Sequence, residues 1–157
     1  MPETSAPTPR TASLLLAIAA ALILAAVFAF QYLGGAAPCP LCIWQRYPYG
    51  VLIALGVIGF FWQPRPMLAL GALVLLVGVG LAGYHYGIEQ GWLALPAGCA
   101  AGGEATSVEE LRQMLREAPP ACDQVQFTVL GLSLAAWNFL ASLGLAAFAG
   151  YAAAIRR

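Results

Sequence analysis

The sequence contains no lysine, only one histidine and few charged residues of any kind. Charged side chains make up 9% of the 157 residues, whereas a soluble domain contains about 25%. Hydrophobic residues make up 61%. Because so little polar surface cannot cover a water-facing globule, the composition excludes an ordinary soluble domain and indicates an integral membrane protein. The formal net charge is zero and there is no basic patch, which argues against nucleic-acid binding.

The hydrophobic residues are gathered in runs long enough to cross a bilayer, which takes about 20 residues of helix. We therefore predict an all-α integral membrane protein with one domain, a bundle of four transmembrane helices. The predicted spans are residues 13–33, 43–62, 67–86 and 129–151. The polar, Pro- and Thr-rich residues 1–12 are predicted to form a disordered tail.

An even number of spans places both chain termini on the same side of the membrane. The arginines on that side are Arg10, Arg65, Arg156 and Arg157. The positive-inside rule makes this side cytoplasmic. Loops 34–42 and 87–127 then lie together on the opposite side, which we predict to be the periplasmic side of a bacterial inner membrane.

Two local features of this plan have alternative interpretations. In the second loop, Ser107-Val-Glu-Glu110 is a capping-box pattern. It predicts a short amphipathic helix to about Glu117, lying either on the membrane surface or against the loop itself. In the second span, Pro48 either kinks a helix that has already begun at Pro40, or starts the main helix after a separate short turn.

Polar residues within the spans are few. Asn138 falls near the middle of the fourth span and Ser142 follows one turn later. In a membrane helix such side chains usually hydrogen-bond a neighbouring helix. We therefore predict a structural role for both of them.

The stretch Cys39-Pro-Leu-Cys42-Ile-Trp-Gln-Arg46 carries the strongest chemical signal. Pro40 suits the first position of a helix, where a missing N–H costs nothing, so Cys39 is predicted to lie near the N-cap. Cys-x-x-Cys pairs and helix N-termini are settings in which the pKa of a thiol is lowered. Arg46 follows Cys42 by four residues, which places both on one helix face, where the guanidinium can support a thiolate or an anionic oxygen.

The other two cysteines, Cys99 and Cys122, lie in the second predicted periplasmic loop. Two pairs on one side of the membrane allow three interpretations: a tetrathiolate zinc site, structural disulfides, or thiol–disulfide exchange between the pairs. A zinc site is disfavoured because Cys99 and Cys122 do not form a second Cys-x-x-Cys, and we predict no metal. We favour exchange, because a thiolate can attack a disulfide in a loop and a second pair can re-oxidise it.

Electrons that leave such a relay need an acceptor. The sequence has neither the Cys-x-x-Cys-His pattern of haem attachment nor the Gly-x-Gly-x-x-Gly pattern of dinucleotide binding. An apolar bundle with Arg46 and His85 at the same depth is suited to a lipid-soluble quinone, whose oxygens accept hydrogen bonds. We therefore predict that Arg46 and His85 contact a quinone.

These features, in this order, resemble the disulfide-bond formation protein B (DsbB) family of the bacterial inner membrane. The matching elements are Cys39 to Arg46, Tyr84-His85, Leu95-Pro-Ala-Gly-Cys99, Cys122-Asp123, and Leu130-Gly-Leu-Ser-Leu-Ala-Ala-Trp-Asn138. The resemblance covers nearly the whole chain after residue 12. It implies a monomeric membrane enzyme that oxidises protein dithiols and reduces ubiquinone or menaquinone.

The resemblance also implies roles for the four cysteines. A DsbA-like periplasmic protein with a thioredoxin fold attacks a Cys99–Cys122 disulfide and becomes joined to Cys99. Cys122 then attacks Cys39, and Cys42 is released as the thiolate that passes electrons to the quinone. Arg46 stabilises the quinone and the thiolate, and His85 hydrogen-bonds a quinone oxygen.

Two other functions compete with this one. A vitamin K epoxide reductase homologue is also a membrane thiol oxidoreductase, but in that family the loop pair precedes the Cys-x-x-Cys, the reverse of the order here. The other alternative is a membrane protein without enzymatic activity whose disulfides are purely structural.

Overall fold

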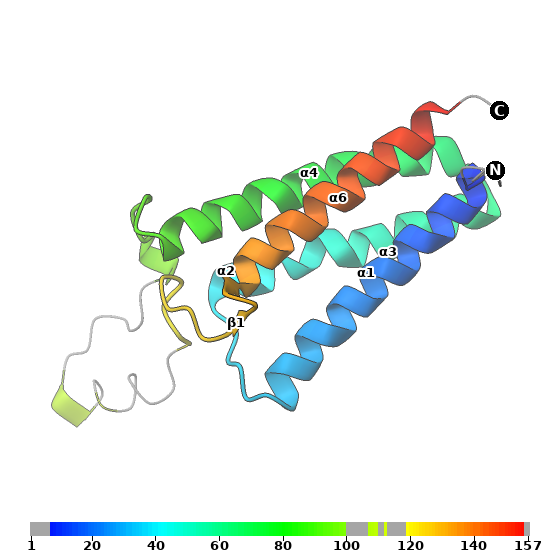
Figure 1. The fold of residues 1–157 in the computed structure, drawn as a ribbon. Coiled ribbons are helices and arrows are strands. Elements are labelled where there is room, and N and C mark those ends of the chain that lie inside the picture. The colour runs from blue at the N-terminus through cyan, green and yellow to red at the C-terminus, as the bar shows by residue number, and fades with distance from the viewer. Residues whose placement is uncertain (1–6, 100–106, 110–111, 113–118, 156–157) are drawn as a thin grey trace.

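The computed structural model of the protein describes residues 7–99, 107–109, 112 and 119–155, and its long helices run side by side (Figure 1). The elements are α1 (Pro9–Tyr32), α2 (Pro40–Trp44), α3 (Arg46–Phe61), α4 (Pro64–Glu89), a 3-10 turn η1 (Ala97–Cys99), β1 (Thr128–Val129), β2 (Leu132–Ser133) and α6 (Leu134–Ala154). The N- and C-terminal ends lie together at one end of the bundle, and α2 and the short strands lie at the other.

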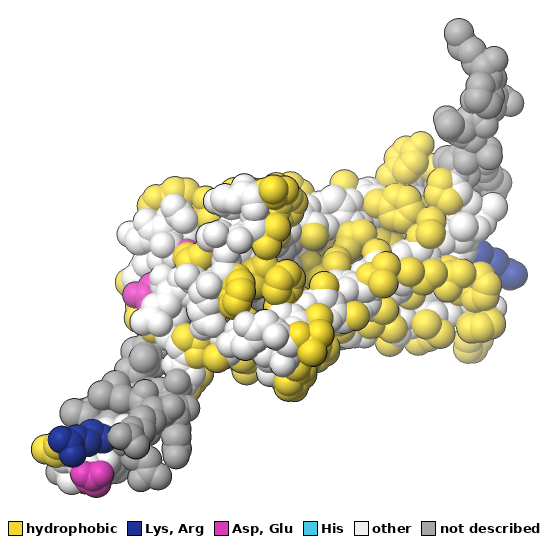
Figure 2. Space-filling view, turned by 60° about the horizontal axis from the view of Figure 1, so that its bottom comes forward, with side chains coloured by type: hydrophobic (Ala, Val, Ile, Leu, Met, Phe, Trp, Pro, Cys, Tyr) yellow, Lys and Arg dark blue, Asp and Glu magenta, His cyan; other side chains and the backbone are white. Residues whose placement is uncertain are grey.

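Within the described residues, four helical stretches are long and apolar enough to cross a membrane: α1, α2 together with α3, α4, and α6. Their outer surfaces expose large apolar side chains, among them Leu22, Leu73 and Val77, each more than 60% exposed. Hydrophobic side chains extend along the length of the body, whereas the visible charged groups lie toward its ends (Figure 2). The chain is therefore an all-α, four-helix, multi-pass membrane protein, as predicted.

Helix α3 packs against α1 and α4, and α4 packs against α6. The core between them consists mainly of leucine and alanine, with Tyr49 among them. Small residues allow the closest approach. A Cβ atom built on Gly56 would lie 2.6 Å from the backbone oxygen of Ser13 and 2.8 Å from the Cβ of Ala17. The contact between α1 and α3 therefore requires glycine at position 56.

We expect Gly56→Ala to destabilise the bundle by about 1–3 kcal/mol, because the added methyl group meets backbone that cannot move aside. Gly80→Ala is the matched control, since a Cβ atom there would find nothing within 4 Å. Thermal unfolding in detergent measures both. Equal unfolding temperatures for the two variants would show that α1 and α3 are not packed as described.

Helix α1 begins at Pro9, so residues 9–12 do not belong to a disordered tail as predicted. The Thr8 side chain caps the helix by accepting a hydrogen bond from the Thr11 N–H, and Pro9 occupies the first turn. These cap signals are present in the sequence and place the helix start four residues before the predicted span. Residues 1–6 lie outside the described residues.

Helix α4 continues to Glu89, past the predicted end of the third span at Tyr86. The helix ends at Gln90, and Gly91 follows with a φ of +72°. The Trp92 N–H donates to the Gly87 carbonyl. Glycine in the left-handed conformation just after a helix is a common stop signal. Gly91 is therefore the sequence signal for the observed end of α4. The extra turn keeps Glu89 on the helix, one turn after His85.

The fourth long helix begins at Leu134, not at the predicted residue 129. Strands β1 and β2 form a two-stranded antiparallel hairpin immediately before it. Leu130 and Gly131 make the turn with φ values of 51° and 81°, the type I′ geometry of tight hairpins. Ser133 then caps α6 by accepting from the Ala136 N–H. Hydropathy alone missed the hairpin because its residues are nearly as apolar as those of the helix.

The structure places the interruption of the second span at Gln45. Residues 40–44 form the separate short helix α2, and α3 begins at Arg46. Pro48 cannot donate to the Trp44 carbonyl and would crowd it in a continuous helix. Pro48 therefore lies in the first turn of α3, where a missing N–H is tolerated. The separate short turn is observed, but the main helix starts at Arg46, two residues before Pro48.

The predicted amphipathic helix from Ser107 to Glu117 falls mostly on residues 110–111 and 113–118, which lie outside the described residues. Of its described residues, Arg112 and Glu109 are exposed and form a surface ion pair at 3.5 Å. The helix therefore stays a prediction.

Candidate active site

The Cys-x-x-Cys segment has the local geometry that its sequence predicts. Cys39 is the N-cap of α2, and Pro40 takes the first helical turn. The Cys39 sulfur accepts a hydrogen bond from the Cys42 backbone N–H at 3.2 Å, and the two sulfur atoms lie 2.7 Å apart, within hydrogen-bond distance. Both cysteines are free thiols in the structure. Their sulfur atoms are close enough to join in a disulfide without rearrangement of the helix.

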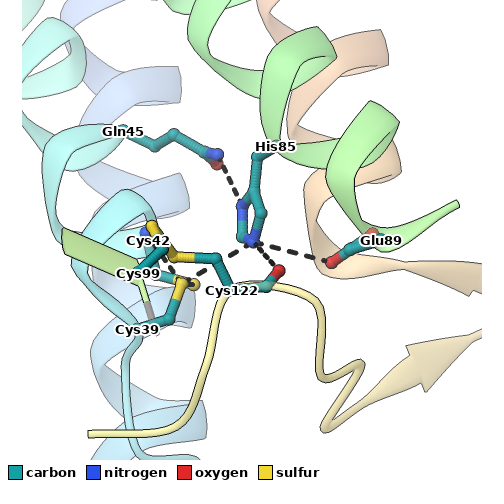
Figure 3. Close-up of a disulfide and its surroundings, with 7 residues drawn as sticks. All are labelled: Cys39, Cys42, Gln45, His85, Glu89, Cys99 and Cys122. Carbon is teal, nitrogen blue, oxygen red and sulfur yellow. Dashed lines mark hydrogen bonds and ion pairs between the residues drawn. A yellow bond between two sulfur atoms is a disulfide. The ribbon is translucent and has the colours of Figure 1, made fainter. Parts of the chain in front are cut away.

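His85 reaches the same sulfur from α4. Its Nε2 atom lies 3.6 Å from the Cys39 sulfur and 3.1 Å from the Cys122 carbonyl oxygen. Its Nδ1 atom lies 2.8 Å from the side-chain nitrogen of Gln45. The ring is 4% exposed and lies between Gln45 on one side and Cys39 and Cys122 on the other (Figure 3). His85 thus connects the Cys-x-x-Cys pair to the loop pair.

These contacts favour a thiolate at Cys39. The hydrogen bond with the Cys42 side chain lowers the pKa of Cys39 most, and the hydrogen bonds with His85 and with the Cys42 backbone add to the effect; burial opposes them, and the pKa falls to about 5. The resemblance had implied a thiolate at Cys42, the partner nearer Arg46. In the structure the two sulfur atoms lie 2.7 Å apart, and it is the pKa of Cys39 that is lowered.

The reduced protein is expected to react with a small alkylating reagent at Cys39 with a half-maximal rate near pH 5. Above that pH Cys39 is a thiolate, and its reactivity is lost as the pH falls through its pKa. Cys42→Ala removes the largest cause of the lowered pKa, so its profile should move toward the ordinary thiol value of about 8.5. Mass spectrometry of the alkylated peptide measures both profiles, and an unchanged midpoint in Cys42→Ala would contradict the assignment.

Cys99 and Cys122 form a disulfide, the pairing that the resemblance implied. Both residues are buried, at 4% and 1% exposure. They form one apolar cluster with Cys39 and Ile88, and Cys42 packs against it. We expected this disulfide in a polar loop open to an incoming thiolate. The structure instead places it against the ends of α2 and α4, which brings all four cysteines together.

Cys39, Cys42 and His85 place one potential metal ligand each within 4.8 Å of one another. Two thiolates on a zinc ion, each about 2.3 Å from the metal in tetrahedral geometry, lie nearly 4 Å apart. The 2.7 Å between these sulfur atoms is much shorter. The arrangement therefore suits a dithiol that closes to a disulfide better than it suits a metal.

A cavity of about 380 Å³ opens beside the Cys-x-x-Cys pair. Its walls come mainly from α1, α6 and the segments 36–39 and 124–129 and are mostly apolar, and both Cys39 and Cys42 line it. Arg46 and Gln31 also line it, and each has a buried polar atom, Nε and Oε1 respectively, with no hydrogen-bond partner among the described residues. The Arg46 guanidinium stacks over the Phe28 ring at 5.0 Å. A buried polar atom without a partner costs free energy of folding. A ligand with hydrogen-bonding groups would supply the partners that these two atoms lack.

The structure brings every predicted site residue to this end of the bundle. Cys39, Cys42, Arg46 and His85 line the cavity, and the Cys99–Cys122 disulfide adjoins it. Sequence reasoning missed the parts played by Gln31 and Gln45. The four-residue spacing of Glu89 from His85 indicates either a partner of His85 or a solvated loop residue. The structure shows the first, because the Glu89 carboxylate lies 3.8 Å from the His85 Nε2 atom and is 6% exposed.

Comparison with known proteins gives the family of this site. The sequence model of the family described as "Disulfide bond formation protein DsbB" matches residues 9–152. The chain belongs to the DsbB family. It is therefore a disulfide-bond-forming membrane oxidoreductase, which decides against the vitamin K epoxide reductase alternative and against purely structural disulfides.

Individual relatives agree with this assignment to the DsbB family. A disulfide bond formation protein B of Methylococcus capsulatus is 32% identical, covering 90% of this chain and 92% of that protein. Another of Dechloromonas aromatica is 31% identical over 81% of each chain. An uncharacterized protein of Rickettsia prowazekii, RP370, is 25% identical over 90% of this chain and 86% of its own. No solved structure matches the chain.

Proposed function

We propose that this DsbB-family protein re-oxidises the dithiol of a DsbA-like, thioredoxin-fold protein and passes the electrons to a membrane quinone. The observation that carries the proposal is the position of both cysteine pairs, in one buried cluster beside an apolar cavity with partnerless polar atoms. Thiol–disulfide exchange needs direct contact between sulfur atoms. The cavity adjoins the Cys39–Cys42 pair, from which the electrons would pass to the quinone.

The first exchange takes place at the Cys99–Cys122 disulfide. A partner thiolate attacks Cys99, forms a mixed disulfide with it, and releases Cys122 as a thiolate; the partner's second thiol then closes the partner's own disulfide and frees Cys99. Because Cys99 is only 4% exposed, the segment around η1 must move outward before the partner can reach it.

The second exchange moves the electrons to the Cys-x-x-Cys pair. The Cys122 thiolate attacks the Cys39 sulfur of an oxidised Cys39–Cys42 pair, which breaks the Cys39–Cys42 bond and releases Cys42. Cys99 then attacks Cys122, restores the loop disulfide and releases Cys39 as a thiolate. The lowered pKa of Cys39 makes it a good leaving group in this last step.

The cavity residues suit a quinone. When bound, a quinone accepts the two electrons and two protons of the dithiol. The Arg46 Nε–H would donate to a quinone oxygen, and the Gln31 Oε1 would accept from a quinol hydroxyl, which gives both atoms the partners they lack. The apolar walls suit the ring and tail of ubiquinone or menaquinone. Quinone contact by His85 stays a prediction, since both ring nitrogens already have protein partners.

We place the cysteine end of the bundle at the periplasmic face of a bacterial inner membrane. Both described chain ends lie at the opposite end of the bundle, where the positive-inside rule puts arginine-rich segments. The periplasm is an oxidising compartment in which disulfides persist. The protein is proposed to act there as a monomer.

The test is to purify the protein in nanodiscs with a reduced DsbA-type partner and ubiquinone or menaquinone. Quinol formation, followed by absorbance, should match the oxidised partner one for one. If the partner is oxidised but no quinol forms, the protein still forms disulfides, and the quinone is rejected as the electron acceptor. A matched preparation with Cys99→Ser tests the partner-facing sulfur, because it should not oxidise the partner.

A further inference from the structure

We propose that Gln45 fixes the tautomer of His85, so that a proton held on Nε2 keeps the Cys122 segment against Cys39. The catalytic role of Gln45 rests on the relay proposed above, whereas the tautomer of His85 can be observed in the resting protein. Gln45 is then a positioning residue that acts through His85, with no direct contact to a reacting atom.

The contacts of Nε2 favour a proton there. Nε2 lies 3.1 Å from the Cys122 carbonyl oxygen, which can only accept a hydrogen bond. It also lies 3.6 Å from the Cys39 sulfur, which accepts when it is a thiolate. An unprotonated Nε2 would turn its lone pair toward both of these acceptors. The ring therefore donates from Nε2 to the loop pair and to the Cys-x-x-Cys pair at once.

The contacts of Nδ1 require it to accept. Gln45 presents its side-chain nitrogen to Nδ1 at 2.8 Å. The orientation of this amide is set by α6, because the Asn138 side-chain nitrogen donates to the Gln45 oxygen at 2.6 Å. Asn138 is oriented in turn, because its oxygen accepts from the Tyr49 hydroxyl. Four successive donors thus point from Tyr49 to Cys122, an arrangement in which each bond strengthens the next.

The charged and titratable groups facing His85 favour the competing state, an imidazolium. They are Cys39, and Glu89 at 3.8 Å from Nε2. An imidazolium donates from both nitrogens, so Gln45 would have to turn its oxygen to Nδ1 and its nitrogen to Asn138. Asn138 would then have to turn as well, giving up the hydrogen bond from Tyr49. Glu89 already accepts from the Ser133 hydroxyl at 2.5 Å. The amide chain therefore keeps the ring neutral.

This series of hydrogen bonds acts in the step that joins the two cysteine pairs. The Cys122 sulfur forms a bond to the Cys39 sulfur while the Cys39–Cys42 bond breaks, and the electron pair leaves on Cys42. The His85 proton is not transferred; its hydrogen bond to the Cys122 carbonyl holds the attacking residue beside its target. Loss of one such bond, about 0.5–1.5 kcal/mol, slows the step by about 2- to 10-fold.

The single histidine of the chain allows a direct test. In full-length protein labelled with 15N-histidine and held in nanodiscs, the two ring nitrogen shifts report which atom carries the proton. We expect a protonated Nε2 and an unprotonated Nδ1. Gln45→Leu should populate both tautomers, and Gln45→Glu should protonate both nitrogens, because a carboxylate accepts from Nδ1–H and still accepts from Asn138.

Asn138→Asp provides an independent variant if Gln45→Leu does not fold. Its carboxylate would turn the Gln45 nitrogen toward itself and the Gln45 oxygen toward His85, so the proton should appear on Nδ1. A wild-type ring protonated at Nδ1 or at both nitrogens would overturn the proposal, as would unchanged shifts in the folded variants. These spectra need no partner and no quinone, so a failure of the relay would leave the tautomer result intact.

The positioning role has its own readout. After reduced partner is mixed with oxidised protein, rapid acid quenching and mass spectrometry follow the Cys39–Cys122 disulfide. We expect its formation to slow by about 2- to 10-fold in Gln45→Leu. An unaltered rate together with an altered tautomer would reject the positioning role.

Discussion

Cys39→Ser is expected to oxidise one equivalent of partner dithiol and then stop. The Cys99–Cys122 disulfide, already present in the structure, can be used once, but without Cys39 there is no Cys39–Cys42 disulfide for Cys122 to attack. Steady-state quinone reduction should fall by at least about 10³-fold, as is usual when a covalent catalytic group is removed. Rapid mixing with reduced partner, followed by thiol counting and quinol absorbance, measures the burst and the loss of turnover.

Cys99→Ser is the matched control for this variant. It leaves the Cys39–Cys42 pair intact, and a small dithiol should still drive quinone reduction through that pair because Cys42 is partly exposed. The protein partner should no longer be oxidised. Continued turnover in Cys39→Ser, or normal partner oxidation by Cys99→Ser, would break the assigned order of the relay.

Arg46→Ala is expected to raise the apparent KM for quinone by about 10- to 100-fold, the equivalent of one charge-assisted hydrogen bond of about 1.5–3 kcal/mol. Its Nε atom is buried at the cavity wall without a protein partner. Oxidation of the partner in a single turnover should be unchanged, because Arg46 has no part in the exchange between sulfurs. Steady-state kinetics at varied quinone concentration and a single-turnover burst separate the two effects.

Two further variants sharpen this test. Phe28→Leu keeps an apolar side chain at this position but removes the ring beneath the Arg46 guanidinium, which lies 5.0 Å away, and should raise the KM for quinone by less than Arg46→Ala does. Gln31→Leu removes the other partnerless polar atom and should weaken quinone binding without loss of stability. If the KM for quinone is unchanged in Arg46→Ala, the quinone binds elsewhere.

Local signals in the sequence were sufficient for much of this site. Pro40 and the Cys-x-x-Cys spacing fixed Cys39 as the N-cap of α2, because helix capping depends on neighbouring residues alone. The helix boundaries were less well predicted. Hydropathy could not distinguish the β1–β2 hairpin from a helix start, and Gly91 was a stop signal that the hydrophobic count ignored.

Contacts between helices could not be read from the sequence. Gln45 was assigned no chemistry, yet it joins His85 to Asn138 across three helices. Asn138 does hydrogen-bond neighbouring elements, as its position within a span predicted. Which helix it would reach depends on how α3, α4 and α6 pack. That packing follows from close contacts of small residues distributed over the whole bundle.

By itself the sequence determined a four-span membrane protein with a reactive cysteine pair, because both properties follow from composition and short-range spacing. Only the tertiary structure decided that Cys39, with His85 beside it, is the favoured thiolate, and that the loop disulfide is buried against it. The physical reason is that the contact of His85 with Cys39 and the approach of the loop disulfide to Cys39 join groups that are far apart in the chain. Folding sets their distances, and no local pattern of residues encodes them.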